Sequence, residues 1–205
     1  MEKIGLLGGT FNPPHLAHLQ LARSAVEILH LDHLFWIPCK PWQKADQKIV
    51  DGHRRCAMVD LMLENKSKMS VDTCEVDRTR DSYSIETIKE IRARFPEATI
   101  YFVMGSDQWE NFHTWKSWKE ILKLVRLAIF TRNGQKAHCA NQVQDFVDQE
   151  GIELAFLEMP AMSTSSQEIR EIIAKEGVLS DKLAGKLARD VIKYIHTLGL
   201  YRKSP

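Results

Sequence analysis

Short apolar runs alternate with amphipathic segments of helical period along the chain, and this alternation limits the fold more than any other sequence feature. Apolar runs bounded by glycine, proline or polar residues predict strands at Ile4–Leu7, His33–Ile37, Met69–Val76, Thr99–Met104, Arg126–Phe130 and Glu153–Leu157. Apolar residues three or four positions apart predict helices at Leu16–Leu29, Arg54–Leu63, Ser84–Phe95, Ser117–Lys123, Asn141–Gln149, Ser166–Lys175 and Asp181–His196. Strands that alternate with helices need crossover connections, so we expect an α/β fold with a mainly parallel sheet.

The composition suits one globular domain. The chain has 205 residues, of which 44% are hydrophobic and 27% charged, values typical of folded proteins. No Gly/Ser-rich or Pro-rich linker divides it. We therefore expect residues 1–205 to form a single domain with a helical C-terminal part from about residue 166.

Charge and cysteine usage exclude several classes of protein. Lys and Arg number 28 against 27 Asp and Glu, and this net charge of +1 argues against a dedicated nucleic-acid binder. No segment approaches the roughly 18 apolar residues of a membrane helix, so we expect no membrane partner. The four cysteines lack metal-binding or redox spacing, which predicts reduced thiols in a cytoplasmic protein.

Parallel α/β sheets bind ligands at the carboxyl ends of their strands. The segments that follow the predicted strands are rich in polar side chains, and several are cationic; they are residues 8–18, 38–44, 77–84, 105–115, 132 and 163–170. We therefore look for functional residues in these segments.

The first of these segments is suited to binding a phosphate. Gly8 and Gly9 let the backbone approach a ligand without a Cβ in the way. A helix is expected to begin near His15, and its first N–H groups and dipole favour an anion. His15 and His18 are three residues apart and so share one face of that helix, where both imidazoles can donate to phosphoryl oxygens. A metal pair is the weaker interpretation, because no third ligand lies nearby.

This segment resembles a known family. Gly9-Thr10-Phe11-Asn12-Pro13 followed by His15-x-x-His18 is similar to the (H/T)xGH signature of nucleotidyltransferases with a Rossmann-like core. Ala17 stands where glycine is common, and Asn12 where bacterial members usually carry aspartate. The resemblance implies a doubly wound, Rossmann-like sheet with helices on both faces. It also implies ATP contacts from residues of the signature, namely Gly8, Gly9, Thr10, Phe11, His15 and His18.

A second match lies near the C-terminus. Ser165, Ser166, Ile169 and Arg170 agree with the ISSTxIR motif of the family, whereas Thr164 and Gln167 depart from it. Either serine can cap a helix that begins here. Arg170 lies one turn further on and can offer its planar fork to phosphate oxygens. The resemblance therefore adds Ser165, Ser166 and Arg170 to the expected ATP site.

The middle of the chain resembles the nicotinate-mononucleotide branch of the family. Its SYTxxTL stretch is similar to the segment that contains Ser82, Tyr83, Ser84 and Thr87, with Ser84 replacing a threonine. In that branch the backbone amides after the tyrosine bind the nicotinate carboxylate. The resemblance implies that these four residues, together with Asn12, contact the mononucleotide.

Further site residues follow other predicted strands. Gly105 and Asp107 resemble a family segment that binds the ATP ribose or its metal-bound phosphates, and Trp115 would stack on the pyridine ring. Lys44 stands in the place of a family loop that contacts phosphate, although Trp42 and Gln43 replace the usual Pro and His. Arg132 matches an arginine that contacts ATP.

The resemblance implies adenylyl transfer from MgATP to nicotinic acid mononucleotide, giving nicotinic acid adenine dinucleotide and pyrophosphate in NAD biosynthesis. The acceptor phosphate is anionic at pH 7, so catalysis rests on alignment and charge stabilisation. We assign this work to His15, His18, Lys44 and Arg170. Mg²⁺ is expected on the ATP phosphates, with Asp107 as a protein contact and no dedicated protein metal site.

Other functions stay open on the sequence alone. The Asn12 variant occurs among enzymes that use nicotinamide mononucleotide, and a phosphopantetheine adenylyltransferase shares the first motif. A cytidylyltransferase fits the same signature. Ala17 and Gln167 would also suit a nucleotide-binding sensor without turnover. Whether the chain forms a homo-oligomer is left open.

Overall fold

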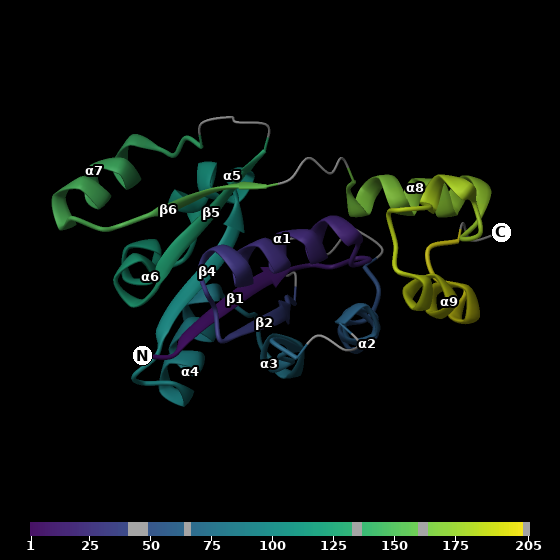
Figure 1. The fold of residues 1–205 in the computed structure, drawn as a ribbon, viewed down its shortest axis with the longest axis horizontal. Helices are drawn as coiled ribbons and strands as arrows, with labels where there is room; N and C mark the ends of the chain where they lie inside the picture. Colours follow the sequence, from purple (N-terminus) through teal and green to yellow (C-terminus); the bar gives the residue numbers. More distant parts are fainter. Residues whose placement is uncertain (41–48, 64–66, 133–136, 160–163, 203–205) are drawn as a thin grey trace.

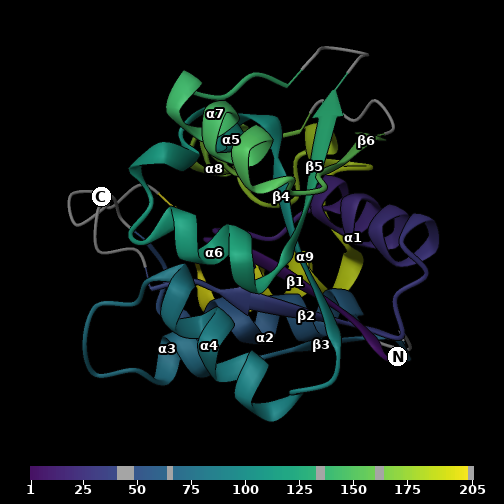
Figure 2. The same ribbon diagram turned by 90° about the vertical axis from the view of Figure 1, so that its left-hand side faces the viewer.

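The computed structural model describes residues 1–40, 49–63, 67–132, 137–159 and 164–202. It contains a parallel sheet of six strands: β1 (Lys3–Gly9), β2 (His33–Pro38), β3 (Met69–Val71), β4 (Thr99–Gly105), β5 (Arg126–Arg132) and β6 (Ala155–Met159). The strand order is β3-β2-β1-β4-β5-β6 (Figures 1 and 2). This order confirms the expected Rossmann-like, doubly wound fold. Since it reverses between β1 and β4, ligands are expected beyond the carboxyl ends of these two strands.

The strands are connected by helices and short helical turns. In chain order these are α1 (Leu16–Ile28), α2 (Gly52–Leu63), α3 (Cys74–Asp77), α4 (Ser84–Arg94), α5 (Ser106–Glu110), η2 (Phe112–Thr114), α6 (Trp118–Leu124), α7 (Asn141–Glu150), α8 (Ser166–Glu176), η3 (Asp181–Leu183) and α9 (Arg189–Leu198). Figures 1 and 2 show helices on both sides of the sheet, as the sequence predicts.

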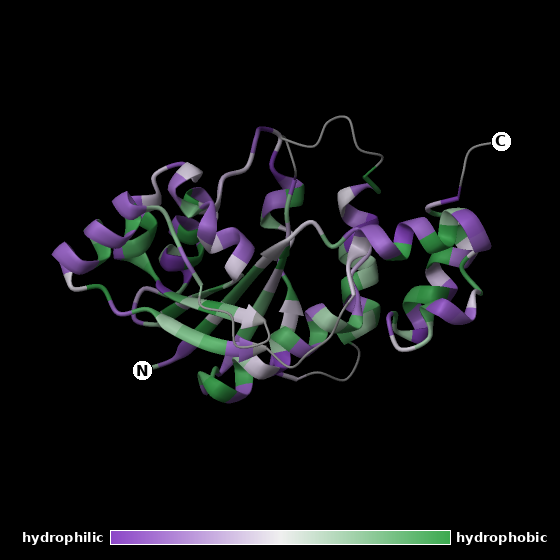
Figure 3. Ribbon diagram, turned by 90° about the horizontal axis from the view of Figure 1, so that it is seen from above, coloured by the Kyte–Doolittle hydropathy of each residue, from purple (hydrophilic) through white to green (hydrophobic). Residues whose placement is uncertain are grey.

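Each face of the sheet has its own hydrophobic core. On one face, α1 and α2 cover strand residues such as Leu34 and Trp36. On the other, α4, α6 and α7 cover residues such as Ile100 and Phe102. The strands are accordingly hydrophobic along most of their length, whereas the helices alternate hydrophilic and hydrophobic residues (Figure 3). Together, the two cores fix the strand ends on which the site is built.

Helices α8 and α9 lie beyond the carboxyl ends of the strands (Figure 1). Their buried residues, among them Ile169, Val191 and Ile195, belong to the same core as α1 and α2. Helix α9 packs directly against α2. Fully burying an aliphatic side chain contributes about 1.5–3 kcal/mol, so this contact fastens the C-terminal helices to the edge of the sheet.

The strand predicted at Met69–Val76 is too long. β3 ends at Val71, and Cys74–Asp77 forms the short helix α3. The Asp72 carboxylate accepts a hydrogen bond from the Cys74 N–H at 3.0 Å, and Thr73 Oγ1 donates to Asp77 Oδ2 at 2.6 Å. These local side-chain bonds turn the chain out of the extended conformation.

The helix predicted at Asp181–His196 is also wrong in part. The segment forms η3 and then α9, with Gly185 between them at a φ of +70°. That left-handed conformation cannot continue an α-helix. Helices α5 and η2 were not predicted either, because they are too short to show a helical period in the sequence. Among the described residues, no helix is long and apolar enough to cross a membrane.

Candidate active site

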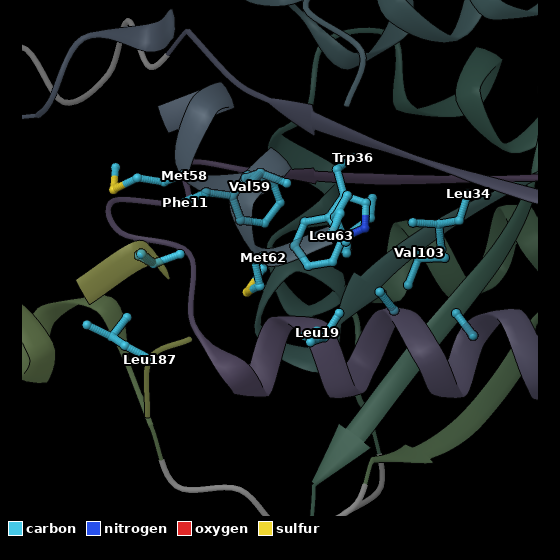
Figure 4. Packing of buried hydrophobic residues seen from close by; sticks show 14 of the residues in the cluster. Phe11, Leu19, Leu34, Trp36, Met58, Val59, Met62, Leu63, Val103 and Leu187 are labelled. Atoms are coloured by element: carbon cyan, nitrogen blue, oxygen red, sulfur yellow. The ribbon is translucent and has the colours of Figure 1, made fainter. Parts of the chain in front are cut away.

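The chain turns sharply between the end of β1 and the start of α1. Phe11 adopts a φ of +48°, which is unusual for a residue other than glycine, and the Asn12–Pro13 bond is cis. The Phe11 ring folds back over Gly9, where a Cβ would lie only 2.8 Å from the ring. The ring is 2% exposed and packs 5.1 Å from Trp36, in the cluster that Figure 4 shows with Met58 and Val59. Gly9 and Phe11 thus fix the path of the loop, while Gly8 is exposed at the end of β1.

His15 and His18 lie together at the start of α1, as predicted. Their rings are stacked with centroids 3.6 Å apart, and the Phe11 ring packs edge-to-face with His18, with centroids 5.1 Å apart. His15 is buried and forms the N-cap of α1. The backbone N–H of His15 donates to Nδ1 of His18 at 3.2 Å. Because Nδ1 of neutral His18 acts as the acceptor here, its Nε2 carries the proton and is the ring's donor.

The start of α1 is less available to an anion than the sequence suggests. The Leu16 N–H, the first amide of the helix, donates to the carbonyl of Lys186 at 2.9 Å. The His18 N–H bonds to the carbonyl of His15 at 2.9 Å. In contrast, the amides of Thr10 and Phe11 make no hydrogen bond within the described residues. The backbone donors left for a phosphate within the described residues are therefore the two loop amides and, in the first turn of α1, the amide of Ala17.

Arg55 is a buried cation that the sequence analysis did not identify. Its side chain, on α2, donates to three backbone carbonyls: that of Val50 at 2.9 Å, that of Thr10 at 2.6 Å and that of Cys39 at 2.9 Å. The residue is 2% exposed, and in the described part of the chain no carboxylate forms an ion pair with it. The sequence does not indicate which of the two adjacent arginines of α2 is buried, and Arg54 is in fact exposed.

The C-terminal helices hold the second half of the loop. Arg170 Nη1 donates to the carbonyl of Asn12 at 2.8 Å, and Ser166 Oγ donates to the carbonyl of Pro13 at 2.9 Å. The Oδ1 of Asn12 accepts from the Tyr201 hydroxyl at 2.9 Å and from the Val50 N–H at 3.2 Å. The side chain of Asn12, predicted to contact the mononucleotide, is thus engaged by protein groups.

The predicted cap of α8 is present. Ser165 is its N-cap and accepts from the Glu168 N–H at 3.1 Å. Arg170 has five N–H donors, and apart from its bond to Asn12 they make no hydrogen bond within the described residues. The structure therefore brings α8 and the signature loop together, with donors of Arg170 left for a ligand.

A second buried network supports the start of α4. Arg78 Nη1 donates to the hydroxyls of Ser82 and Thr87, the latter at 2.9 Å, and Nη2 donates to Glu90 at 2.7 Å. Thr87 in turn donates to Glu75 Oε1 at 2.7 Å. Burial raises the pKa of the Glu75 carboxyl, and the Thr87 hydrogen bond and the Arg78 charge oppose this rise. Ser82 and Thr87, predicted to contact the mononucleotide, are both buried in this network.

The N-terminus of α4 carries the other two predicted contacts. Tyr83 is its N-cap, and the amides of Ser84 and Ile85 make no hydrogen bond within the described residues. Lys116 Nζ lies 4.0 Å from the centroid of the Tyr83 ring. The start of α4 therefore combines two unbonded amides with the nearby Lys116 cation. Neither the amides nor Lys116 takes part in the hydrogen bonds of Arg78.

Three predicted site residues, Gly105, Asp107 and Trp115, lie at the end of β4 or shortly after it. Gly105 leaves room for the exposed Asp107, whose Oδ1 would be 2.6 Å from a Cβ at that position. Trp115 packs edge-on against Phe102, with centroids 5.7 Å apart, and at 5.4 Å from Phe112. A Cβ at Gly8 would lie 3.7 Å from the Phe102 ring. Phe102 therefore connects Trp115 to the carboxyl end of β1.

The remaining predicted contacts are those of Lys44 and Arg132, and no dedicated metal site was expected. Lys44 lies outside the described residues. Arg132 is the last residue of β5, at the expected edge of the sheet. Within the described ranges, no group of three or more His, Cys, Asp or Glu side chains is arranged to hold a metal.

Comparison with known proteins gives a consistent result. Residues 6–172 match the family model described as cytidylyltransferase-like, whose nucleotidyltransferases generally use a divalent metal with the nucleotide. The probable nicotinate-nucleotide adenylyltransferase of Methylibium petroleiphilum is 34% identical over 98% of this chain and 92% of that protein. That of Bordetella petrii is 35% identical over 98% of this chain and all of that protein. Nicotinic acid mononucleotide adenylyltransferase of Plasmodium falciparum, complexed with NaAD, shares the fold with a TM-score of 0.79 and 19% identity, covering 98% of each chain.

Proposed function

Since the chain belongs to the cytidylyltransferase-like family of nucleotidyltransferases, we propose that it transfers the adenylyl group of MgATP to nicotinic acid mononucleotide. The products are nicotinic acid adenine dinucleotide and pyrophosphate, and the reaction is a step of NAD biosynthesis. The observation that carries this proposal is the set of full-length relatives named for this activity, combined with the stacked histidines at the end of β1. We further propose that residues 1–205 act as one domain, in the cytoplasm.

The acceptor phosphate is the nucleophile. Its oxygen forms a bond to the α-phosphorus of ATP as the bond from that phosphorus to the bridging oxygen breaks, and pyrophosphate leaves with the electron pair. No proton needs to be removed from the acceptor, because it is already anionic at pH 7. The protein supplies alignment and charge stabilisation instead.

His18 stabilises the charge that develops on the α-phosphate. The backbone N–H of His15 donates a hydrogen bond to Nδ1 of His18, so the protonated Nε2 is the donor to a non-bridging phosphate oxygen. The stack with His15 and the edge of Phe11 hold the ring in place. A preorganised donor of this kind contributes about 10²–10³ to kcat. The remaining N–H groups of Arg170, together with Lys44, bind the other phosphate oxygens.

The residues present fit a Mg²⁺ ion bound mainly by ATP. Mg²⁺ usually keeps several waters and takes one or two protein carboxylates. Asp107 is exposed in α5, two residues after the end of β4, and suits that role. When bound, the ion neutralises part of the charge on the phosphates.

The start of α4 and Trp115 bind the mononucleotide. The Ser84 and Ile85 amides, at the positive end of the helix dipole, hold the nicotinate carboxylate. Trp115 stacks on the pyridine ring. Ser82 and Thr87 act indirectly, by fixing Arg78 and the start of α4. The hydrogen bonds of Asn12 to Tyr201 and Val50 make its side chain a support of the loop.

Pyrophosphate release by the purified protein tests the proposal. The protein is supplied with MgATP and one of three acceptors: nicotinic acid mononucleotide, nicotinamide mononucleotide or phosphopantetheine. We expect rapid release with the first and a rate at least about tenfold lower with the others, since the amide lacks the charge that α4 binds. Faster release with another acceptor would overturn the assignment of nicotinic acid mononucleotide as the substrate. ATP binding without pyrophosphate release would favour a nucleotide-binding sensor.

A further inference from the structure

We infer that Arg55 is a positioning residue for the transfer: its buried guanidinium orients the Thr10–Phe11 peptide so that the Phe11 N–H faces the transferred phosphoryl group. This inference rests on the proposed function. Its starting point is the bond from Arg55 Nη1 to the Thr10 carbonyl at 2.6 Å, the shortest of the three that Arg55 makes to backbone oxygens.

The geometry of a trans peptide links that carbonyl to the neighbouring amide. In a trans peptide the C=O and the following N–H point in opposite directions. The only cis bond among the described residues is Asn12–Pro13, so the Thr10–Phe11 peptide is trans. With its oxygen held by Arg55 on the α2 side, the Phe11 N–H points away from the core.

The preceding peptide is fixed in the same way. The carbonyl of Gly9 accepts from the Cys39 N–H at 2.8 Å, which turns the Thr10 N–H away from β2. Neither the Thr10 nor the Phe11 amide has a hydrogen-bond partner within the described residues. Two successive amides, followed by the left-handed Phe11, resemble the backbone concavities that bind anions. Arg55 and Cys39 hold this arrangement from behind.

Arg55 also brings a positive charge to the back of the loop. Its partners are three carbonyl dipoles from separate segments, and the charge is not neutralised by an ion pair in the described part of the chain. Burial raises the pKa of the nearby Tyr201 hydroxyl, while the charges of Arg170 and Arg55 act to lower it. Both guanidinium groups therefore lie close to the residue that holds Asn12. A buried, unpaired cation is unfavourable by itself, and an anion bound on the other side of the loop offsets that cost.

Only an arginine can make this set of contacts. The planar fork reaches the carbonyls of Val50, Thr10 and Cys39 at once, from Nε, Nη1 and Nη2. Lysine keeps the charge but loses the fork, and glutamine keeps two N–H donors but loses the charge. The two substitutions therefore separate the two contributions.

The experiment compares Arg55→Lys and Arg55→Gln with the control Arg54→Lys, at the exposed neighbouring position on α2. Measured quantities are kcat, the KM of each substrate, and the midpoint of urea unfolding. We expect kcat to fall by about 10- to 100-fold in Arg55→Lys and further in Arg55→Gln, which is the range of losing one oriented oxyanion donor or less. The KM of the mononucleotide should stay within about twofold, and the control should match the wild type.

Several results would overturn the inference. One is a kcat of Arg55→Lys equal to that of the wild type, and another is a loss of kcat no larger than the unfolded fraction of that variant explains. An effect on KM alone would also overturn it, as would failure of both Arg55 variants to fold where the Arg54→Lys control folds. If the wild type itself releases no pyrophosphate, the proposed function fails instead. ATP titration then decides about Arg55: binding weakened at least about tenfold in both variants, but not in the control, supports it, and unchanged binding overturns it.

Discussion

The two supports of the site are built differently. The signature loop is held mainly through its backbone by residues distant in sequence: Arg170 bonds to the carbonyl of Asn12 across 158 positions, and Ser166 bonds to the carbonyl of Pro13 across 153. The start of α4 is held through side chains close in sequence: Arg78 reaches Ser82 across 4 positions and Thr87 across 9. The first support therefore depends on the whole fold, whereas the second is nearly complete within one crossover of the sheet.

This difference assigns different tasks to the two regions. Carbonyl oxygens fixed from several directions set the orientation of amides, which is what transfer chemistry requires. A network of two carboxylates, two hydroxyls and a guanidinium sets the position of a helix end, which is suited to binding. Changes in the loop should therefore lower kcat, and changes beside α4 should raise the KM of the mononucleotide.

The largest expected effect is that of His18→Ala. We expect kcat to fall by about 10²–10³, since the variant lacks the Nε2 donor at the α-phosphate. The KM of the mononucleotide should change little. Steady-state kinetics and circular dichroism measure this, with His196→Ala, an exposed histidine of α9, as the control. Full activity of a folded His18→Ala protein would mean that the signature loop takes no part in the transfer step. The proposed difference between the loop and the start of α4 would then be wrong.

The next effect concerns the binding side. Trp115→Ala should raise the KM of the mononucleotide by about 10-fold or more, because stacking of a base on an aromatic ring contributes roughly 1–3 kcal/mol. The KM of ATP should change much less. Trp118→Ala is the matched control, since Trp118 packs on Phe146, with ring centroids 5.4 Å apart. Equal increases for both substrates would show that Trp115 serves both halves of the site.

The smallest effect is a pH dependence of stability at Glu75. Its pKa in the folded protein is raised above the ordinary value of 4.5, mainly by burial. The stability that the protonated form contributes is complete below pH 4.5 and is lost as the pH rises through the folded-state pKa. Glu75→Gln has no such loss, so its free energy of unfolding relative to wild type should rise with pH over that window.

Urea unfolding of both proteins at a series of pH values measures this difference. We expect the Tm to follow the same trend, with changes of no more than about 3 °C. A difference that stays constant as the pH rises would mean that the Arg78 network compensates fully for the burial of Glu75, and a difference that falls would mean that it more than compensates.

The sheet and the histidine pair could be predicted because both leave a pattern in the sequence. Apolar runs separated by helical periods indicate a parallel sheet, and Gly9 to His18 carry a recognisable spacing. Arg55 could not be found in this way, because its three partners are carbonyls, and a carbonyl is present at every position. The role of Tyr201 could not be predicted for a different reason: its partner Asn12 lies 189 positions away, and no sequence pattern links residues so far apart.

The segment around Tyr83 was located correctly on α4, but two of its side chains face inward. A motif marks where a function lies without separating residues that touch a ligand from residues that hold the backbone. Ser82 and Thr87 are buried, and that is a property of packing against Glu75 and Arg78. Arg78 carries no signature of its own in the sequence, so the network could be seen only in three dimensions.

The bond between Arg170 and Asn12 has a consequence for the order in which the protein is made. A ribosome adds 158 residues after Asn12, and Arg170 is the last of them. Domains begin to fold from the N-terminus during synthesis, so β1 and α1 can pack while the loop between them still lacks its C-terminal supports. All six strands of the sheet, the last of which ends at Met159, are therefore synthesised before the C-terminal supports of the signature loop.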